Sequence, residues 1–159
     1  MVAAIVSVHM SVREGVRRAD QAIQARHPKV DVPASKLKTE IARILEDVKR
    51  AVPVQQARRM IGLAGTITTL ASLQQGLTHY DPTRTHHARL TRAAVGQLFV
   101  RLASVDVATR RGMLLEPKRA EVIVGGVAVL AMILREFDIE ELMVSESDIL
   151  DGLAASLRY

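Results

Sequence analysis

The sequence predicts an α/β protein, a small sheet packed with helices, because short β-branched segments alternate with longer amphipathic ones. Three apolar stretches are typical of strands: Val2 to Val8, Ala57 to Ala64 and Ile139 to Ser145. Between them, apolar residues recur every three or four positions, as on one face of a helix. The length of 159 residues favours one domain, residues 1–159, that is large enough to bury a core.

Two helices are predicted between the first and second strands. The first, Ser11 to Ala25, stops before His27-Pro28 because the residue before a proline avoids helical dihedral angles. The second begins at the cap Ser35 and runs to about Arg50. It is the most clearly amphipathic stretch of the chain, so we expect it to cover one side of the sheet. Its apolar face comprises Leu37, Ile41, Ile44, Leu45 and Val48.

A helix opened by Thr66 follows the second strand and is predicted to end near Gln75-Gly76, since glycine commonly follows a helix end. The next stretch, Thr78 to His87, is polar, contains a proline and carries three of the five histidines. No partner cluster of histidines or carboxylates with metal-ligand spacing accompanies it. We therefore expect this stretch to be a connector rather than a metal site.

The rest of the chain is predicted to be helical apart from the third strand. Thr91 caps one helix, and a short turn of helix follows it. Pro117 begins the longest apolar segment, which is apolar on nearly every side and should be buried. Ser145 or Ser147 caps a closing helix. The remaining assignments are inward-facing Val95, Leu98, Phe99 and Leu102, a short helix Val107 to Gly112, a buried run Val122 to Leu134, and the closing helix Asp148 to Leu157.

Composition narrows the class of partner. The formal charge is +5, and 17 of the 22 basic residues are arginine, which pairs well with phosphate and carboxylate groups. Nucleic acid is not favoured, because aromatic residues, on which bases stack, make up only 3% of the chain. The chain has no cysteine, hence no disulfide or thiolate chemistry. It has neither a signal-peptide pattern nor a membrane-spanning apolar run, so we expect a cytoplasmic protein.

The stretch from Met60 to Ala71 is the first candidate for a functional site. A strand, Gly65 and then Thr66 open a helix, whose unpaired amide groups and positive dipole end suit a phosphate or carboxylate. The alternative is ordinary packing, with Thr66 as the helix cap and Gly65 only turning the chain. A second candidate is Gly125-Gly126, where a neighbouring backbone or a flat ligand must approach closely to justify two helical glycines.

Four segments, in order and suitably separated, resemble the exopolyphosphatase and guanosine pentaphosphate phosphohydrolase (Ppx/GppA) family. They are residues 65–71 (GTITTLA), the His86-His87 loop leading to Leu90-Thr91, residues 115–130 (LEPKRAEVIVGGVAVL) and residues 144–153 (VSESDILDGL). The resemblance covers Met60 to Leu153 well. Residues 6–13 (VSVHMSVR) resemble, more loosely, a family strand that ends in a Gly-Ser-Val-Arg turn, although the glycine is missing.

The resemblance implies half of a two-domain, actin-like and ribonuclease-H-like fold, incomplete at its N-terminal strands. It implies hydrolysis of terminal phosphoanhydride bonds in polyphosphate or guanosine pentaphosphate, with Mg²⁺, in a cleft between the domains. By the same resemblance Gly65, Thr66 and Thr68 line the cleft, Arg119 meets the anionic substrate, and Gly125 and Gly126 lie where the wider fold binds nucleotides. The family's first phosphate loop, its water-activating glutamate and its Gly-Gly-Gly-Ser-Thr-Glu loop have no counterpart here.

Three interpretations remain open at the level of sequence. The chain is a phosphatase fragment or a divergent relative, a non-catalytic module that binds an anion or nucleotide, or a structural subunit whose first domain is a separate chain. We expect that the chain alone does not hydrolyse polyphosphate, because no catalytic residue or metal ligand is identified in it. Missing strands would leave sheet edges unpaired, which predicts a homo-oligomer, a rearranged first strand and helix that fill the gap, or a first-domain partner.

Overall fold

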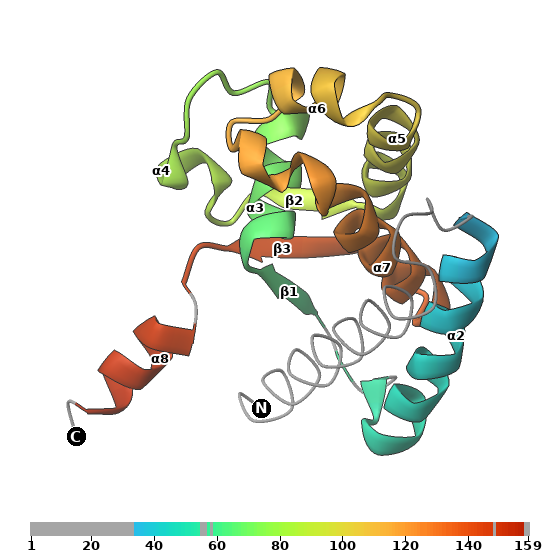
Figure 1. Cartoon of the computed structure of the whole chain (residues 1–159). Helices are drawn as coiled ribbons and strands as arrows, with labels where there is room; N and C mark the ends of the chain where they lie inside the picture. Colours follow the sequence, from blue (N-terminus) through green and yellow to red (C-terminus); the bar gives the residue numbers. More distant parts are fainter. Residues whose placement is uncertain (1–33, 55–56, 58, 148, 158–159) are drawn as a thin grey trace.

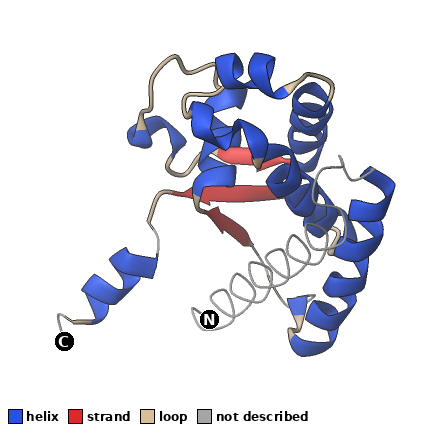
Figure 2. Cartoon of the chain, viewed as in Figure 1, coloured by secondary structure: helices blue, strands red, loops and turns tan. Residues whose placement is uncertain are grey.

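A computed structural model describes residues 34–54, 57, 59–147 and 149–157 (Figure 1). Within them, three strands form one mixed sheet and helices make up most of the remainder (Figure 2). This confirms the predicted fold class. The predicted strand Val2 to Val8 and helix Ser11 to Ala25 lie outside the described residues. No described helix has the length and apolar character needed to cross a membrane.

The sheet has the order β1-β3-β2. Strand β1 (Met60–Leu63) runs parallel to β3 (Glu141–Ser145), and β2 (Arg89–Thr91) runs antiparallel to β3 on its other side. The two outer strands are four and three residues long, so the sheet is small. Strand β2 was not predicted. It is so short that its alternation, one buried leucine between two exposed residues, gives no periodic signal.

Most of the predicted helices that fall within the described residues are present, with changes at their ends. The long amphipathic helix is α2 (Ala34–Ala51), and the helix capped by Thr91 is α5 (Arg92–Ala103). The Thr91 hydroxyl accepts a hydrogen bond from the Ala94 N–H at 3.1 Å, as a cap should. The other helices are α3 (Gly65–Gln74), α6 (Val107–Met113), α7 (Ile123–Glu136) and α8 (Ile149–Ser156).

Two predictions about local structure were wrong. The connector before β2 contains a short helix, α4 (Pro82–Thr85), because Asp81 caps the Thr83 N–H at 3.0 Å and Pro82 supplies a helical φ. Pro117 does not open the long apolar helix. It opens a separate 3₁₀ helix, η2 (Pro117–Glu121), and α7 begins only at Ile123. Arg119 therefore lies in its own short turn beside α7 rather than within it.

The core lies between the sheet and the helices α3, α5 and α7. Buried leucines of each element meet there, as do Leu90, Leu142 and Val144 from the strands. Arg110 of α6 is also buried. Its guanidinium donates hydrogen bonds of 2.7 to 2.9 Å to the carbonyls of Leu102, Val105 and Ala120, so backbone acceptors satisfy its N–H groups.

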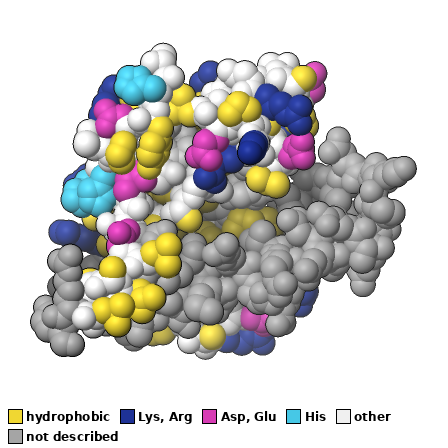
Figure 3. All heavy atoms as spheres, turned by 60° about the vertical axis from the view of Figure 1, so that its left-hand side comes forward, with side chains coloured by type: hydrophobic (Ala, Val, Ile, Leu, Met, Phe, Trp, Pro, Cys, Tyr) yellow, Lys and Arg dark blue, Asp and Glu magenta, His cyan; other side chains and the backbone are white. Residues whose placement is uncertain are grey.

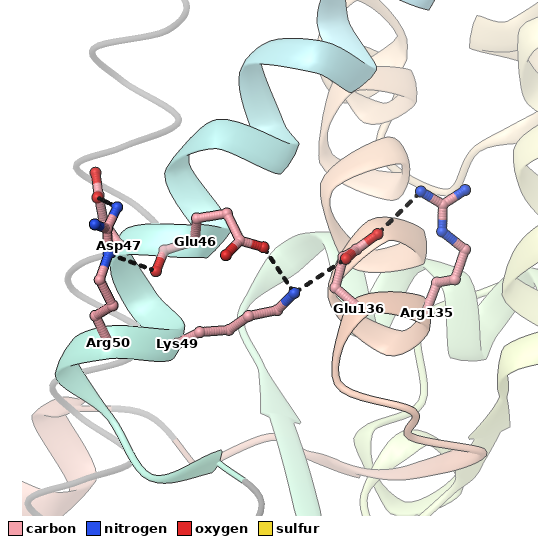
Figure 4. Close-up of polar contacts among 6 residues, drawn as sticks. All are labelled: Glu46, Asp47, Lys49, Arg50, Arg135 and Glu136. Carbon is pink, nitrogen blue, oxygen red and sulfur yellow. Dashed lines mark hydrogen bonds and ion pairs between the residues drawn. The ribbon is translucent and has the colours of Figure 1, made fainter.

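A second apolar cluster attaches α2 to the far side of α7. Ile41 and Leu45 of α2 pack against Val129 and Met132 of α7, among others. Polar contacts continue this interface (Figure 4): Lys49 of α2 donates to Glu46 of its own helix at 2.8 Å and to Glu136 of α7 at 3.2 Å. Helix α2 thus packs on α7, whereas its predicted task was to cover the sheet directly.

Candidate functional site

The candidate site lies at one edge of the sheet, where the parallel strands β1 and β3 both end. Leu63 and Ser145, the last residues of the two strands, are paired in the register of the sheet. The chain leaves β1 into the start of α3 and leaves β3 at Glu146. Carboxyl ends of parallel strands are a common place for ligands in α/β proteins, because the loops that follow them converge there.

The start of α3 holds its backbone in an unusual conformation. The helix begins at Gly65, and Ala64 precedes it with φ 73° and ψ 171°, a combination that is found almost entirely in glycine. Thr66 is therefore not the cap. The Ala64 carbonyl accepts the N–H groups of Ile67 and Thr68, while the N–H groups of Gly65 and Thr66 bond to no described group. Two amide donors at the positive end of the helix are thus left for another acceptor.

Arg119 of η2 lies directly over Gly65. A Cβ atom built on Gly65 would overlap the Arg119 guanidinium, so only glycine allows this approach. Arg119 Nε lies 2.8 Å from Glu116 Oε2 as an ion pair, yet this buried atom forms no hydrogen bond with any described group. The side chain of Arg119 is one-third exposed. Its guanidinium therefore combines solvent access with a position beside the two amide donors of α3.

Thr66 and Gly126 bring the starts of α3 and α7 together. A Cβ on Gly126 would lie 2.6 Å from Thr66 Oγ1 and 3.1 Å from its Cγ2, so the threonine packs on the bare glycine. The sequence predicted that a neighbouring backbone or a flat ligand approaches the glycine pair, whereas a threonine side chain makes the approach, and only at Gly126. A Cβ on the neighbouring Gly125 would meet nothing within 4 Å.

The structure brings four of the six predicted site residues together. Gly65, Thr66, Arg119 and Gly126 form one contact cluster, which we call the helix-start cluster. Gly125 precedes Gly126 in the chain but makes no such contact. Thr68 points back along its own helix, where its hydroxyl donates a long hydrogen bond of 3.4 Å to the Gly65 carbonyl.

A second polar group was missed by the sequence reasoning. Both carboxylate oxygens of Glu146 accept hydrogen bonds, one from the Tyr80 hydroxyl and the other from the hydroxyl of the fully buried Thr85. The Glu146 N–H donates to His86 Nδ1 at 3.1 Å. The sequence signal for this group was the carboxylate of Glu146 directly after a predicted strand. The two hydroxyl groups that bind it lie about 60 residues away in sequence, so no local pattern could reveal them.

Tyr80 links this group to the helix-start cluster electrostatically. The hydrogen bond to Glu146 raises the pKa of Tyr80 to about 12, aided by burial and by the negative charges of Glu146 and Glu116. Arg119 acts in the opposite direction on the same hydroxyl. The groups around Tyr80 thus come from two segments of the chain: Glu146 follows β3, and Glu116 and Arg119 belong to the η2 turn.

An open hollow of about 610 Å³ lies beside the Glu146 group, lined by Pro82 and Thr83 of α4 and by Glu146, Ser147 and Asp151. His86 and His87 contribute to its wall, and their rings are 3.8 Å apart. Within the described ranges, no group of three or more histidine or acidic side chains could hold a metal ion. The described residues thus do not fit the Mg²⁺ that the resemblance implies, and we assign no ligand to it.

The fold and the site together define a mixed α/β domain in which two helix starts and an arginine meet at the carboxyl edge of a parallel strand pair. The sequence pattern of the Ppx/GppA phosphatase family matches residues 4–157. The chain belongs to this family.

Curated and solved relatives agree with this assignment. Exopolyphosphatase 2 of Mycobacterium tuberculosis is 42% identical over 118 residues, which cover 71% of this chain and 37% of that protein. A solved exopolyphosphatase-like protein superposes with a TM-score of 0.76 at 25% identity, over 85% of this chain and 47% of that one. The Ppx/GppA phosphatase of Aquifex aeolicus gives 0.62 at 27% identity, over 74% and 41%.

The chain therefore spans less than half the length of these relatives. A different and shorter similarity accompanies them. Over 36 residues, which are 23% of its length, this chain is 67% identical to small ribosomal subunit protein uS8 of Solibacter usitatus. That similarity covers 28% of the ribosomal protein and carries no argument about the site.

Proposed function

We propose that this chain binds the terminal phosphates of a phosphoanhydride, polyphosphate or guanosine pentaphosphate, at the helix-start cluster. The observation that carries the proposal is the guanidinium of Arg119 above Gly65, beside two amide N–H groups without a described acceptor. Arginine and helix-start amides both favour phosphate oxygens, because their N–H groups and positive charge match the acceptor. Family membership supplies the class of ligand.

The helix-start cluster is better suited to binding a phosphate group than to catalysing its transfer. Phosphoryl transfer needs a positioned nucleophile and neutralisation of charge on the transferred group. The helix-start cluster offers positive charge and donors. Glu116, the nearest carboxylate to Arg119, is occupied by its ion pair with that arginine. We therefore propose that the family activity, hydrolysis of terminal phosphoanhydride bonds, needs parts of the longer relatives that this chain does not span.

A direct test measures binding of inorganic tripolyphosphate by calorimetry. Arg119→Ala should weaken binding about 10- to 100-fold, the effect expected for one or two charged hydrogen bonds. Arg111→Ala is the matched control, because it removes the same charge from an exposed arginine that is paired with Glu121 at 2.7 Å. Equal losses in the two variants would mean that only net charge attracts the ligand and would contradict the proposed site.

A second variant separates position from charge. Gly65→Ala keeps every charged group but places a methyl group where the Arg119 guanidinium lies. We expect it to weaken tripolyphosphate binding nearly as much as loss of the arginine, with unchanged far-ultraviolet circular dichroism. Unaltered affinity in this variant would remove Gly65 from the site.

Hydrolysis by the chain alone is tested separately. Purified chain is incubated with polyphosphate or guanosine pentaphosphate and Mg²⁺, and released phosphate is measured. We expect no release above the background of the Arg119→Ala variant. Robust release that is lost in Arg119→Ala or Thr66→Ala would show that the chain is a phosphatase by itself. Tight binding without release favours the alternative function, a non-catalytic module that senses the same anion or nucleotide.

A further inference from the structure

The buried Arg110 of α6 joins the end of α5 to the turn that carries Arg119. Its Nε donates a hydrogen bond of 2.9 Å to the carbonyl of Leu102, in the last turn of α5. Nη2 donates to the Val105 carbonyl between α5 and α6, and Nη1 donates to the Ala120 carbonyl of η2, both at 2.7 Å. Three nitrogens that serve three carbonyls in different directions make use of the planar fork of a guanidinium. Arg110 therefore fastens η2 to α5.

Helix η2 depends on such outside contacts for its position. It is a 3₁₀ helix of five residues, a type with poorer hydrogen-bond geometry than an α-helix. Backbone bonds tie its ends: the Arg119 N–H donates to the Glu116 carbonyl at 3.0 Å, and the Val122 N–H donates to the Arg119 carbonyl at 3.1 Å. These bonds close the turn but do not fix where it lies. The bond from Arg110 does, because Arg110 is anchored at α5, whose Leu102 is buried in the core.

The residue that Arg110 holds in η2 is the direct neighbour of Arg119. The Ala120 side chain is fully buried in the core, and its carbonyl accepts the bond from Arg110. Successive side chains of a 3₁₀ helix point about 120° apart, since the helix has three residues per turn. Once the side chain and the carbonyl of Ala120 are both fixed, the direction in which Arg119 leaves the turn is fixed as well. That direction leads to Gly65.

The contact between Arg119 and Gly65 tolerates little movement. The guanidinium occupies the space in which a side chain at position 65 would begin, so it lies directly against the first turn of α3. A phosphate group meets the guanidinium and the amide N–H groups of α3 together only if their spacing is kept. Functional groups must be held within about 0.5 Å of their working positions, and a displacement of about 1 Å can cost about 100-fold.

Arg110 is not placed to contact the anion itself. Its side chain is only 8% exposed, and its three nitrogens donate to backbone carbonyls. Exposed cations differ from it. Figure 3 shows basic side chains next to acidic ones on one face of the molecule, and Arg111 of α6 pairs with Glu121 at 2.7 Å. Ion pairs that are open to water add little to the stability of a structure. Of these two neighbouring arginines, Arg110 is therefore the one that sets the position of η2.

We infer that Arg110 is a positioning residue for the anion site: it holds η2 through the Ala120 carbonyl and thereby keeps the Arg119 guanidinium over Gly65. This inference rests on the proposed function, in which Arg119 and the first amides of α3 contact the phosphate. It adds to that function a buried arginine that acts through another arginine. The geometry of the fork, more than the charge of Arg110, is what this role requires.

Arg110→Lys separates the fork from the charge, because an ammonium keeps the charge but does not span three carbonyls. We expect it to weaken binding of inorganic tripolyphosphate about 10-fold in calorimetry, the effect of a displacement smaller than about 1 Å at the site. Arg111→Lys is the matched control, since it makes the same change at the next, exposed position and should leave the affinity unchanged. Unaltered affinity in Arg110→Lys, or equal losses in the two variants, would overturn the inference.

A double variant shows whether Arg110 acts through Arg119. Arg110→Lys combined with Arg119→Ala should bind tripolyphosphate no more weakly than Arg119→Ala alone, because the group that Arg110 positions is already gone. A general loosening of the fold would reduce the affinity further in the double variant. Such a further loss would contradict the positioning role.

The position of Arg119 can also be followed without any ligand. In nitrogen-15 NMR spectra, assigned with the help of Arg119→Ala, we expect the signals of Arg119 Nε–H and Gly65 N–H to shift in Arg110→Lys and to stay in place in Arg111→Lys. Unchanged signals in Arg110→Lys would overturn the inference whatever the affinity. A chain that fails to bind tripolyphosphate would instead contradict the proposed function, while the two signals still decide the positioning.

Circular dichroism establishes that each variant is folded. If Arg110→Lys is not, Ala120→Gly takes its place in both measurements, because it frees the same part of η2 and leaves every donor of Arg110 intact. We expect it to shift the signals of Arg119 and Gly65 and to weaken tripolyphosphate binding. Unaltered signals and affinity in a folded Ala120→Gly variant would show that the position of Arg119 does not depend on this contact.

Discussion

Two adjacent glycines of α7 show how strongly a single position depends on its neighbours. Gly125 faces open space, whereas Gly126 has Thr66 against its α-carbon. Glycine within a helix costs about 1 kcal/mol relative to alanine. We therefore predict that Gly125→Ala stabilises the chain by about 0.5 to 1 kcal/mol. Gly126→Ala should destabilise it by about 1 to 3 kcal/mol, because the new methyl group must displace the threonine.

Urea unfolding of the two single variants and of Thr66→Ala/Gly126→Ala measures both effects. Without the threonine side chain the Gly126 substitution should become neutral or stabilising, since the contact of 2.6 Å is gone. A destabilisation by Gly126→Ala that persists in the double variant would show that something other than Thr66 occupies this space.

At the scale of the residue, the sequence singled out glycines that the structure places in close contact with other side chains, but it did not indicate which side chains these are. Gly65 was singled out because it turns the chain from a strand into a helix, and Gly126 because two glycines within a helix are costly. The sequence could not show that an arginine side chain fills the space above one and a threonine the space above the other. Both contacts join residues more than 50 positions apart, and such pairs leave no local pattern. The strained dihedral angles of Ala64 were equally hidden, because alanine gives no signal for a positive φ.

At the scale of the element, one hydrogen bond ties the segment before α4 to the end of β3. The Tyr80 hydroxyl donates to Glu146, and the pKa of Tyr80 is raised to about 12. An unfolded tyrosine has a pKa of about 10. The contribution to stability is therefore complete below pH 10 and is lost as the pH rises through 12, where the phenolate would face the carboxylate. We predict that the free energy of unfolding falls across this interval.

Tyrosinate absorbance measures the titration directly. The chain has two tyrosines, so the substitution Tyr159→Phe leaves Tyr80 as the only reporter. We expect its midpoint near pH 12 in the folded chain and a lower midpoint after Glu146→Gln, which removes the negative charge. A midpoint near 10 in the otherwise unaltered chain would show that the hydrogen bond does not form in solution.

The elements themselves were predictable where local chemistry decides them. Thr91 caps α5, Gly76 with φ 62° stops α3, and the apolar periodicity of residues 35–50 matches α2. Strand β2 and helix α4 were missed because each is defined by partners elsewhere. β2 pairs with β3, which lies about 50 residues further on, and Thr85 of α4 is buried by Glu146 and its surroundings. Tertiary contacts outweigh intrinsic propensity in such short elements.

At the scale of the whole molecule, the excess of positive charge should guide an anion to the site. The formal charge is +5. We predict that tripolyphosphate affinity falls steeply between about 0.05 M and about 1 M salt, because the screening length shrinks from over 10 Å to about 3 Å. The slope should be shallower in Arg119→Ala, which has lost a direct charge contact. Affinity that does not change with salt would contradict electrostatic recognition.

The pairing of β1 with β3 also has a consequence for folding during synthesis of the chain. Met60 pairs with Leu142, so about 80 residues must be synthesised before the central strand can receive its parallel neighbour. At about 5 to 20 residues per second, this takes roughly 4 to 16 seconds. Helices α3 and α5 have time to form in this interval, whereas the backbone N–H and C=O groups of β1 have no partner strand until β3 has been made. We therefore expect helices to form before the sheet while the chain is being synthesised.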